Sequence, residues 1–262
     1  MRENLKFLVV GDTIIDENVY LKASGLSLES PTIKTNYSHS KINYGGAANV
    51  AKFLATFNRD VTFMTSLSDE HNFLFEQNNP TVKVLNFYQG NNNIKTRYWV
   101  HHGDETYKYL QVNNVNEEFS YSLLLDYDVS EFDIIAFADY RCGFITDSFI
   151  LNCTKSGKIT YASSQISSKS SNYDRYWDID YIVCNKNEST YVDRKTNICV
   201  TKGDSGCEMN GISYPAYPVD KVLNTIGAGD CFYAALLASG NPEFANEQSA
   251  KYVSSDFHEQ NN

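Results

Sequence analysis

The segment Asn224–Leu237 joins a Gly-Ala-Gly turn to the start of an apolar helix. Gly227, Ala228 and Gly229 let a ligand approach the backbone closely, and the first N–H groups of a helix have no partner within it. Together with the helix dipole, these groups form a natural site for an anion. Asp230 follows at once. Its carboxylate either caps the helix or, beside an anion site, accepts a proton from an attacking hydroxyl.

A second glycine pair, Gly45-Gly46, precedes another helical stripe that begins at Ala47. Asn49 then falls in the first turn, where its amide can both donate to and accept from a sugar hydroxyl. A simple tight turn explains the same two glycines equally well.

These candidate residues are embedded in alternating strands and helices. Short apolar runs predict buried strands at residues 7–10, 61–64, 82–85, 134–138, 181–184 and 198–201. Helices are expected at residues 47–57, 144–153 and 230–239. This alternation predicts an α/β fold, with helices on both faces of a mostly parallel sheet.

Two polar, weakly β stretches, residues 17–44 and 94–112, interrupt this alternation. Within the second, Thr96–Leu110 is predicted to form a β-hairpin. Because open α/β sheets bind ligands at the carboxyl ends of their strands, a small sheet inserted there would act as a lid that excludes water.

Charge and cysteine content exclude other classes. The chain has 22 Lys and Arg against 32 Asp and Glu, for a net charge of −10. Such a chain lacks the basic footprint of a nucleic-acid-binding protein. The six cysteines include no Cys-x-x-Cys pair, which excludes a zinc ribbon, and they are expected to be free thiols. No apolar run is long enough for a membrane span or a signal peptide, so a cytoplasmic location is expected.

The two glycine segments, in this order, resemble the signatures of the ribokinase-like (PfkB) carbohydrate kinases, and the similarity runs from about Leu5 to the C-terminus. The resemblance implies a single kinase domain over residues 1–262, built as a three-layer α/β sandwich with a central, mostly parallel sheet. It implies a β-sheet lid near residues 13–44 and 94–112, through which a homodimer could form. ATP, Mg²⁺ and a sugar or sugar phosphate are the expected ligands.

The resemblance also implies roles for individual residues. Asp230 would be the catalytic base, and the N–H groups of Gly227, Ala228 and Gly229 would hold the transferring phosphoryl. Sugar hydroxyls would be bound by Asp16, Gly45, Gly46 and Asn49. The nucleotide site would include Asn185, Glu188, Thr201, Gly203 and Gly206. Glu188 would also hold Mg²⁺ through water.

Other segments resemble a narrower branch, the kinases of D-glycero-β-D-manno-heptose 7-phosphate. They are Ser27–Pro31, Lys95–Arg97 and Asp139-Tyr140. Lys95 and Arg97 lie two apart on a predicted strand and so project to one face, where they could grip a sugar phosphate. A solvated edge strand is the alternative. Asp139 and Arg141 are further candidates for substrate binding.

This branch implies phosphorylation of the anomeric hydroxyl to a 1,7-bisphosphate, on the way to ADP-heptose for lipopolysaccharide. Fructose, ribose or a nucleoside are alternative acceptors, and a non-catalytic sugar- or nucleotide-binding homologue is the alternative of a different class. That alternative is motivated by two departures from the family pattern. Only nine residues separate Glu188 from Ile198, where a helix is usual, and only 32 follow Asp230.

Overall fold

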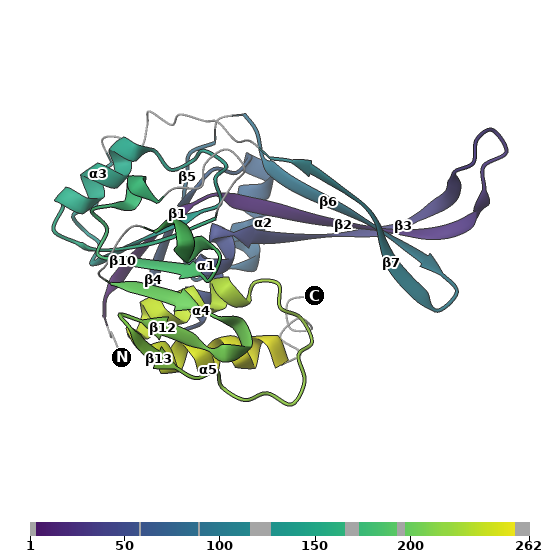
Figure 1. The fold of residues 1–262 in the computed structure, drawn as a ribbon. Coiled ribbons are helices and arrows are strands. Elements are labelled where there is room, and N and C mark those ends of the chain that lie inside the picture. Colours follow the sequence, from purple (N-terminus) through teal and green to yellow (C-terminus); the bar gives the residue numbers. More distant parts are fainter. Residues whose placement is uncertain are drawn as a thin grey trace.

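The computed structural model describes residues 4–57, 59–88, 90–115, 127–165, 173–192 and 197–254. Among these residues, nine strands form the main sheet, in the order β13-β12-β11-β10-β9-β8-β1-β4-β5 (Figure 1). Their bounds are β1 Lys6–Gly11, β4 Asp60–Thr65, β5 Val82–Asn86, β8 Ile134–Asp139, β9 Ile159–Ser164, β10 Tyr181–Asn185, β11 Ile198–Thr201, β12 Cys207–Met209 and β13 Ile212–Tyr214. The strands from β5 to β11 pair in parallel, and β12 and β13 are antiparallel.

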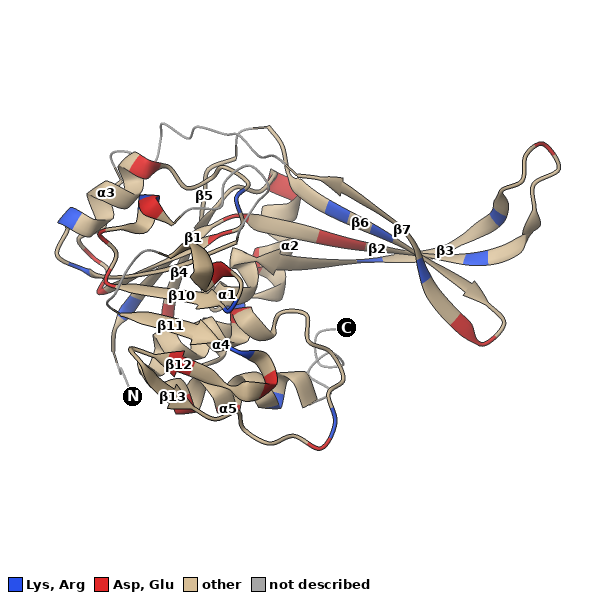
Figure 2. Cartoon of the chain, in the orientation of Figure 1, with Lys and Arg blue, Asp and Glu red and all other residues tan. Residues whose placement is uncertain are grey.

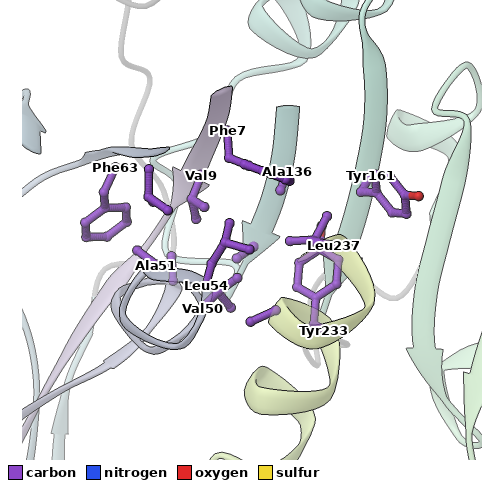
Figure 3. Packing of buried hydrophobic residues seen from close by; sticks show 14 of the residues in the cluster. Phe7, Val9, Val50, Ala51, Leu54, Phe63, Ala136, Tyr161, Tyr233 and Leu237 are labelled. Atoms are coloured by element: carbon purple, nitrogen blue, oxygen red, sulfur yellow. The ribbon is translucent and has the colours of Figure 1, made fainter. Parts of the chain in front are cut away.

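Helices cover both faces of this sheet, as predicted. On one face lie α1 (Ala47–Thr56), α2 (Asp69–Asn78), α4 (Ala228–Ser239) and α5 (Pro242–Ser254), which contribute buried side chains to one hydrophobic cluster. On the other face, α3 (Asp147–Lys155) contributes to a second cluster. Figure 3 shows α1 and α4 packing side by side against the central strands.

The central strand β1 shows why the chain folds this way. Its side chains alternate between the two clusters: Phe7 and Val9 face α1 and α4, and Leu8 and Val10 face α3. Because both faces are covered, the strand is an unbroken apolar run rather than an alternating one. The carboxyl ends of β1 and β8 then lie at one edge of the sheet, close to the N-terminus of α1.

A second sheet of four strands projects from this body as a long arm (Figure 1). Its order is β3-β2-β6-β7, with β2 Thr13–Leu26, β3 Ile33–Gly46, β6 Asn93–His102 and β7 Glu105–Asn114. Two antiparallel hairpins, β2–β3 and β6–β7, are joined by parallel pairing of β2 with β6. The predicted hairpin within residues 94–112 is therefore confirmed.

The six predicted strands all form, and β10 pairs in parallel with β11 despite the short connection. That connection contains a turn of 3₁₀ helix at Glu188–Tyr191, while residues 193–196 and the polar tail 258–262 lie outside the described residues. The predicted helix 144–153 begins later, at Asp147, because Thr146 caps it by accepting the N–H of Phe149 at 3.2 Å. Within the described part of the chain, every helix is too short or too polar to cross a bilayer.

Candidate active site

The two glycine turns meet beyond the carboxyl ends of the parallel strands of the main sheet. Gly46 caps α1 with φ +65°, and Gly227 caps α4 with φ +85°, a left-handed conformation that favours glycine. A Cβ on Gly45 would lie 2.8 Å from Oδ2 of Asp16, and one on Gly227 would lie 3.6 Å from Nδ2 of Asn49. The absence of side chains therefore brings both turns against the predicted sugar-binding residues.

The carboxylate of Asp230 lies between two hydrogen-bond donors. Asn49 donates from Nδ2 to Oδ2 at 3.1 Å, and the phenol of Tyr140 donates to Oδ1. The cap of α4 is Gly227, and Asp230 is the third residue of the helix. The interpretation of Asp230 as a simple helix cap is therefore wrong, because its side chain turns across to α1 and to the end of β8.

Two opposing effects set the charge of this carboxylate. Burial raises the pKa of Asp230, while the hydrogen bonds from Tyr140 and Asn49 and the charge of Lys52 lower it. Burial also lowers the pKa of Lys52, to about 8, and its Nζ donates to the carbonyl of Tyr44 at 2.7 Å. The pKa of Asp230 is thus set by burial acting against its neighbours, a combination that is typical of residues at functional sites.

The start of α4 offers backbone donors beside Asp230. Among the described residues, the N–H groups of Gly227 and Gly229 meet no acceptor, while that of Ala228 donates to the carbonyl of Thr225 at 3.2 Å. Of the three N–H groups predicted to form the anion site, two are therefore available to an anion, and the third is used in the turn. A Cβ on Gly229 would meet no atom within 4 Å, so this position faces open space.

That open space belongs to a cavity of about 530 Å³. The three residues predicted to line the nucleotide site, Thr201, Gly203 and Gly206, all line it, as do Ala228 and Gly229. Its apolar wall comes from the segment 216–222 and from α4 and α5, which include Val222, Phe232 and Val253. The cavity could hold a flat apolar group of a ligand whose anionic end reaches the N-terminus of α4.

The Asn185–Glu188 turn closes on itself. Oδ1 of Asn185 accepts the N–H groups of Asn187 and Glu188, both at 2.9 Å, and Oε2 of Glu188 accepts the N–H of Asn185 at 2.8 Å. Burial raises the pKa of Glu188. No group of three His, Cys, Asp or Glu able to hold a metal occurs in the part of the chain that the structure describes. One carboxylate still fits a magnesium ion that keeps most of its water and binds phosphate oxygens.

Asp16 and the two predicted phosphate-binding cations come together where the arm leaves the body. Nη1 of Arg97 lies 2.5 Å from Oδ1 of Asp16, and Lys95 is the register partner of Asp16 across the β2–β6 pair. Figure 2 shows this cationic part of β6 beside the acidic part of β2. Arg97 is thus committed to Asp16, whereas Lys95 forms no ion pair with the described residues.

Asp139 and Arg141 are engaged with other residues of the protein, and their role in direct substrate binding stays a prediction. Asp139 is 2% exposed and accepts hydrogen bonds from the hydroxyls of Tyr176 and Ser164. Nε of Arg141 donates to the carbonyl of Gln165 at 3.0 Å and lies 3.5 Å from Oδ2 of Asp139. A buried carboxylate requires such partners, and Arg141 is one of the partners of Asp139.

Two residues that surround Asp230, namely Lys52 and Tyr140, were not predicted from the sequence. Lys52 is three residues after Asn49 and so lies on the same side of α1, which was a usable signal. Tyr140 was noted only as part of a dipeptide, and nothing local to it indicates a contact with a residue 90 positions later.

Comparisons with known proteins place the fold. No family model matches the chain. A bifunctional protein HldE from Campylobacter jejuni is 24% identical in an alignment of 288 residues. The alignment covers 95% of this chain and 61% of that protein. The chain thus spans about three-fifths of the length of this relative.

Solved structures agree over almost the whole chain. A ribokinase from Thermotoga maritima is 19% identical, with a TM-score of 0.66 over 98% of this chain and 95% of that one. An Arabidopsis thaliana ribokinase complexed with ribose and ATP is 18% identical, with a TM-score of 0.64 over 95% and 91%. These neighbours confirm the expected architecture.

Proposed function

We propose that this chain, whose fold is that of the ribokinase-like carbohydrate kinases, is an ATP-dependent sugar kinase with Asp230 as its general base. The observation that carries the proposal is the setting of Asp230. Its carboxylate is held by Asn49 and Tyr140 beside backbone donors that open onto a cavity. A base, an anion site and a cavity in that order are what transfer of a phosphoryl group to an alcohol requires.

The cavity beside Thr201, Gly203 and Gly206 would take the nucleotide, with its γ-phosphate at the N–H groups of Gly227 and Gly229. The acceptor oxygen forms a bond to the γ-phosphorus as the bond from phosphorus to the bridging oxygen of ADP breaks. The hydroxyl proton passes to the carboxylate of Asp230. When bound, Mg²⁺ would neutralise phosphate charge, and Glu188 is the residue that would hold it, through water.

For the acceptor, we propose the anomeric hydroxyl of D-glycero-β-D-manno-heptose 7-phosphate. Lys95 supports a phosphorylated sugar, because its charge lies on the strand beside Asp16 and is not paired with any described residue. The ion pair of Arg97 with Asp16 favours a second candidate, an unphosphorylated sugar such as fructose or ribose, because it leaves one free cation rather than two.

A coupled ADP-release assay over phosphorylated and unphosphorylated sugars tests the proposal. We expect turnover that falls about 10²- to 10⁴-fold in Asp230→Asn, with nucleotide binding retained. Asp60→Asn is the matched control, since Asp60 is an exposed carboxylate at the start of β4, at the amino end of the parallel strands and so away from the site. Absence of turnover with every sugar would favour the non-catalytic homologue, and faster turnover of unphosphorylated sugars would exclude the heptose phosphate.

The homodimer through the arm remains a proposal. Every residue of β7 is exposed, including Tyr109, Leu110 and Val112, at 56, 49 and 46%. An exposed apolar edge strand invites pairing with another chain. Light scattering tests this, with a dimer expected for the parent and a monomer for Leu110→Glu; a monomeric parent would exclude it.

A further inference from the structure

Asp12, which follows β1, is buried and holds the turn that comes after β8. The side chain is 1% exposed and accepts three backbone N–H groups: from Tyr140 at 2.9 Å, Cys142 at 3.2 Å and Phe144 at 3.1 Å. Burial and the neighbouring charge of Asp139 raise the pKa of Asp12. A carboxyl with this many backbone donors is a structural anchor rather than a reactive group.

The turn needs an anchor because its backbone is strained. Arg141 has φ +60° and Gly143 has φ +86°, and the first of these is unfavourable for a residue with a side chain. Such a conformation persists only where its surroundings fix it. Here the three bonds to Asp12 and one from the N–H of Arg141 to Oδ1 of Asp139, at 2.8 Å, fix it.

This turn carries Tyr140, whose phenol reaches Asp230. The phenol donates to Oδ1 of Asp230 while Asn49 donates to Oδ2, so each oxygen of the carboxylate has one donor and its plane is set. Burial and the charge of Asp230 raise the pKa of Tyr140 well above its ordinary value, which keeps the phenol protonated and a donor. Each carboxylate oxygen retains a lone pair for an incoming hydroxyl.

We propose that Tyr140 is a positioning residue for Asp230, orienting the carboxylate toward the acceptor hydroxyl and stabilising its ionised form. This inference deepens the proposed function and rests on it for its catalytic meaning. The titratable groups that act electrostatically on Asp230, or on which it acts, are Tyr140, Lys52, Asp16, Cys231 and Tyr252. Of these, Tyr140 is the one that donates a hydrogen bond to the carboxylate within the described residues.

Tyr140→Phe tests the role in activity. We expect kcat to fall about tenfold or more, with KM for ATP unchanged. The acid limb of the pH–rate profile should move to higher pH, because loss of the donor raises the pKa of Asp230. Tyr233→Phe is the matched control: it removes another buried phenol, one that donates to the carbonyl of Phe137 at 3.1 Å, and the limb should stay in place. An unmoved limb in Tyr140→Phe would overturn the inference.

A titration that needs no turnover separates this inference from the proposed function. The carboxyl signals of isotope-labelled aspartates are followed by NMR against pH, and the Asp230 signal is assigned by its absence from Asp230→Asn. The Asp230 midpoint should rise in Tyr140→Phe and stay constant in Tyr233→Phe. If the parent phosphorylates no sugar, the proposed function fails while this shift still decides the contact; an unchanged midpoint refutes the role of Tyr140 whatever the enzyme does.

Discussion

Nδ2 of Asn49 lies 3.1 Å from Oδ2 of Asp230, so the first turns of α1 and α4 face each other through their side chains. The two residues are 181 positions apart in the chain. Both belong to glycine-capped helices packed on the same face of the main sheet. The sugar side and the phosphate side of the proposed site are therefore joined by one hydrogen bond.

Replacing Asn49 tests this junction. Asn49→Leu keeps the approximate size of the side chain and removes the donor, so kcat/KM should fall about 10- to 100-fold, the effect of losing a hydrogen bond to a charged group. The acid limb of the pH–rate profile should shift upward, since this bond lowers the pKa of Asp230. Asn78→Leu, at an exposed amide of α2 that donates to the carbonyl of Leu74, is the control. Equal activity in the two variants would contradict the assignment.

Lys52→Met should separate stability from activity. The pKa of Lys52 is about 8 in the folded chain, below the ordinary 10.5, so the folded state binds this proton more weakly than the unfolded state. The charged lysine therefore costs stability at and below about pH 8, and that cost disappears as the pH rises toward 10.5. We expect the variant to gain thermal stability at pH 7 but little at pH 10.5.

Whereas stability at pH 7 should increase in Lys52→Met, activity should decrease. The positive charge lowers the pKa of Asp230, so its loss should shift the acid limb to higher pH and reduce turnover near that limb. Melting curves and pH–rate profiles of parent and variant measure both effects. A variant that is less stable at pH 7, or whose limb is unmoved, would show that Lys52 does not act through its charge.

The two cations of β6 should behave differently. Lys95→Ala should raise KM about 10- to 100-fold for phosphorylated sugars and leave unphosphorylated sugars unaffected, because it removes a charge and no described ion pair. Arg97→Ala also frees Asp16, its partner at 2.5 Å, so it should raise KM for both kinds of sugar. Steady-state kinetics with a sugar and its phosphate decide; the same pattern in both variants would argue against this division.

Gly206→Ala should damage the cavity. Gly206 has φ +86°, and a Cβ there would lie 2.2 Å from the carbonyl oxygen of Tyr214 and 2.5 Å from the nitrogen of Ala216, in the segment that forms the cavity wall. Gly211→Ala is the matched control, since Gly211 has φ +81° with no atom within 4 Å. The control should lose only the backbone strain, about 1–2 kcal/mol. Gly206→Ala should lose more stability and raise KM for ATP, and equal effects would exclude the clash.

The main sheet was predictable where a strand is a run of large apolar residues, as in β1 and β8. The strand β9 was not predicted because Thr160, Ser163 and Ser164 are residues typical of a loop, although most of the strand is buried where it pairs with β8. The helices α2 and α5 were not predicted for a related reason. They bury few side chains, of which Phe75 is the one in α2, so no apolar stripe marks them.

The residues of the candidate site also divide into those that a local pattern predicts and those that depend on distant contacts. Glycine turns that open helices have a local signature, and Gly45, Gly227 and Asn49 were found from it. Asp139 and Arg141 were predicted to bind substrate from a resemblance to a narrower branch, and that resemblance does not reveal their contacts with Tyr176 and Gln165. The role of Asp12 depends on N–H groups at least 128 residues later, and no local pattern encodes such a contact.

The position of β1 in the sheet has a consequence for synthesis on the ribosome. Of the strands of the main sheet, β1 is made before the others, and its partner β4 follows within about sixty residues, but its other neighbour, β8, begins only at Ile134. Until then one edge of an apolar strand has no hydrogen-bonding partner, which makes the nascent chain prone to aggregation. We expect slow translation between β4 and β8 to increase the demand for chaperones, and faster translation of that stretch to relieve it.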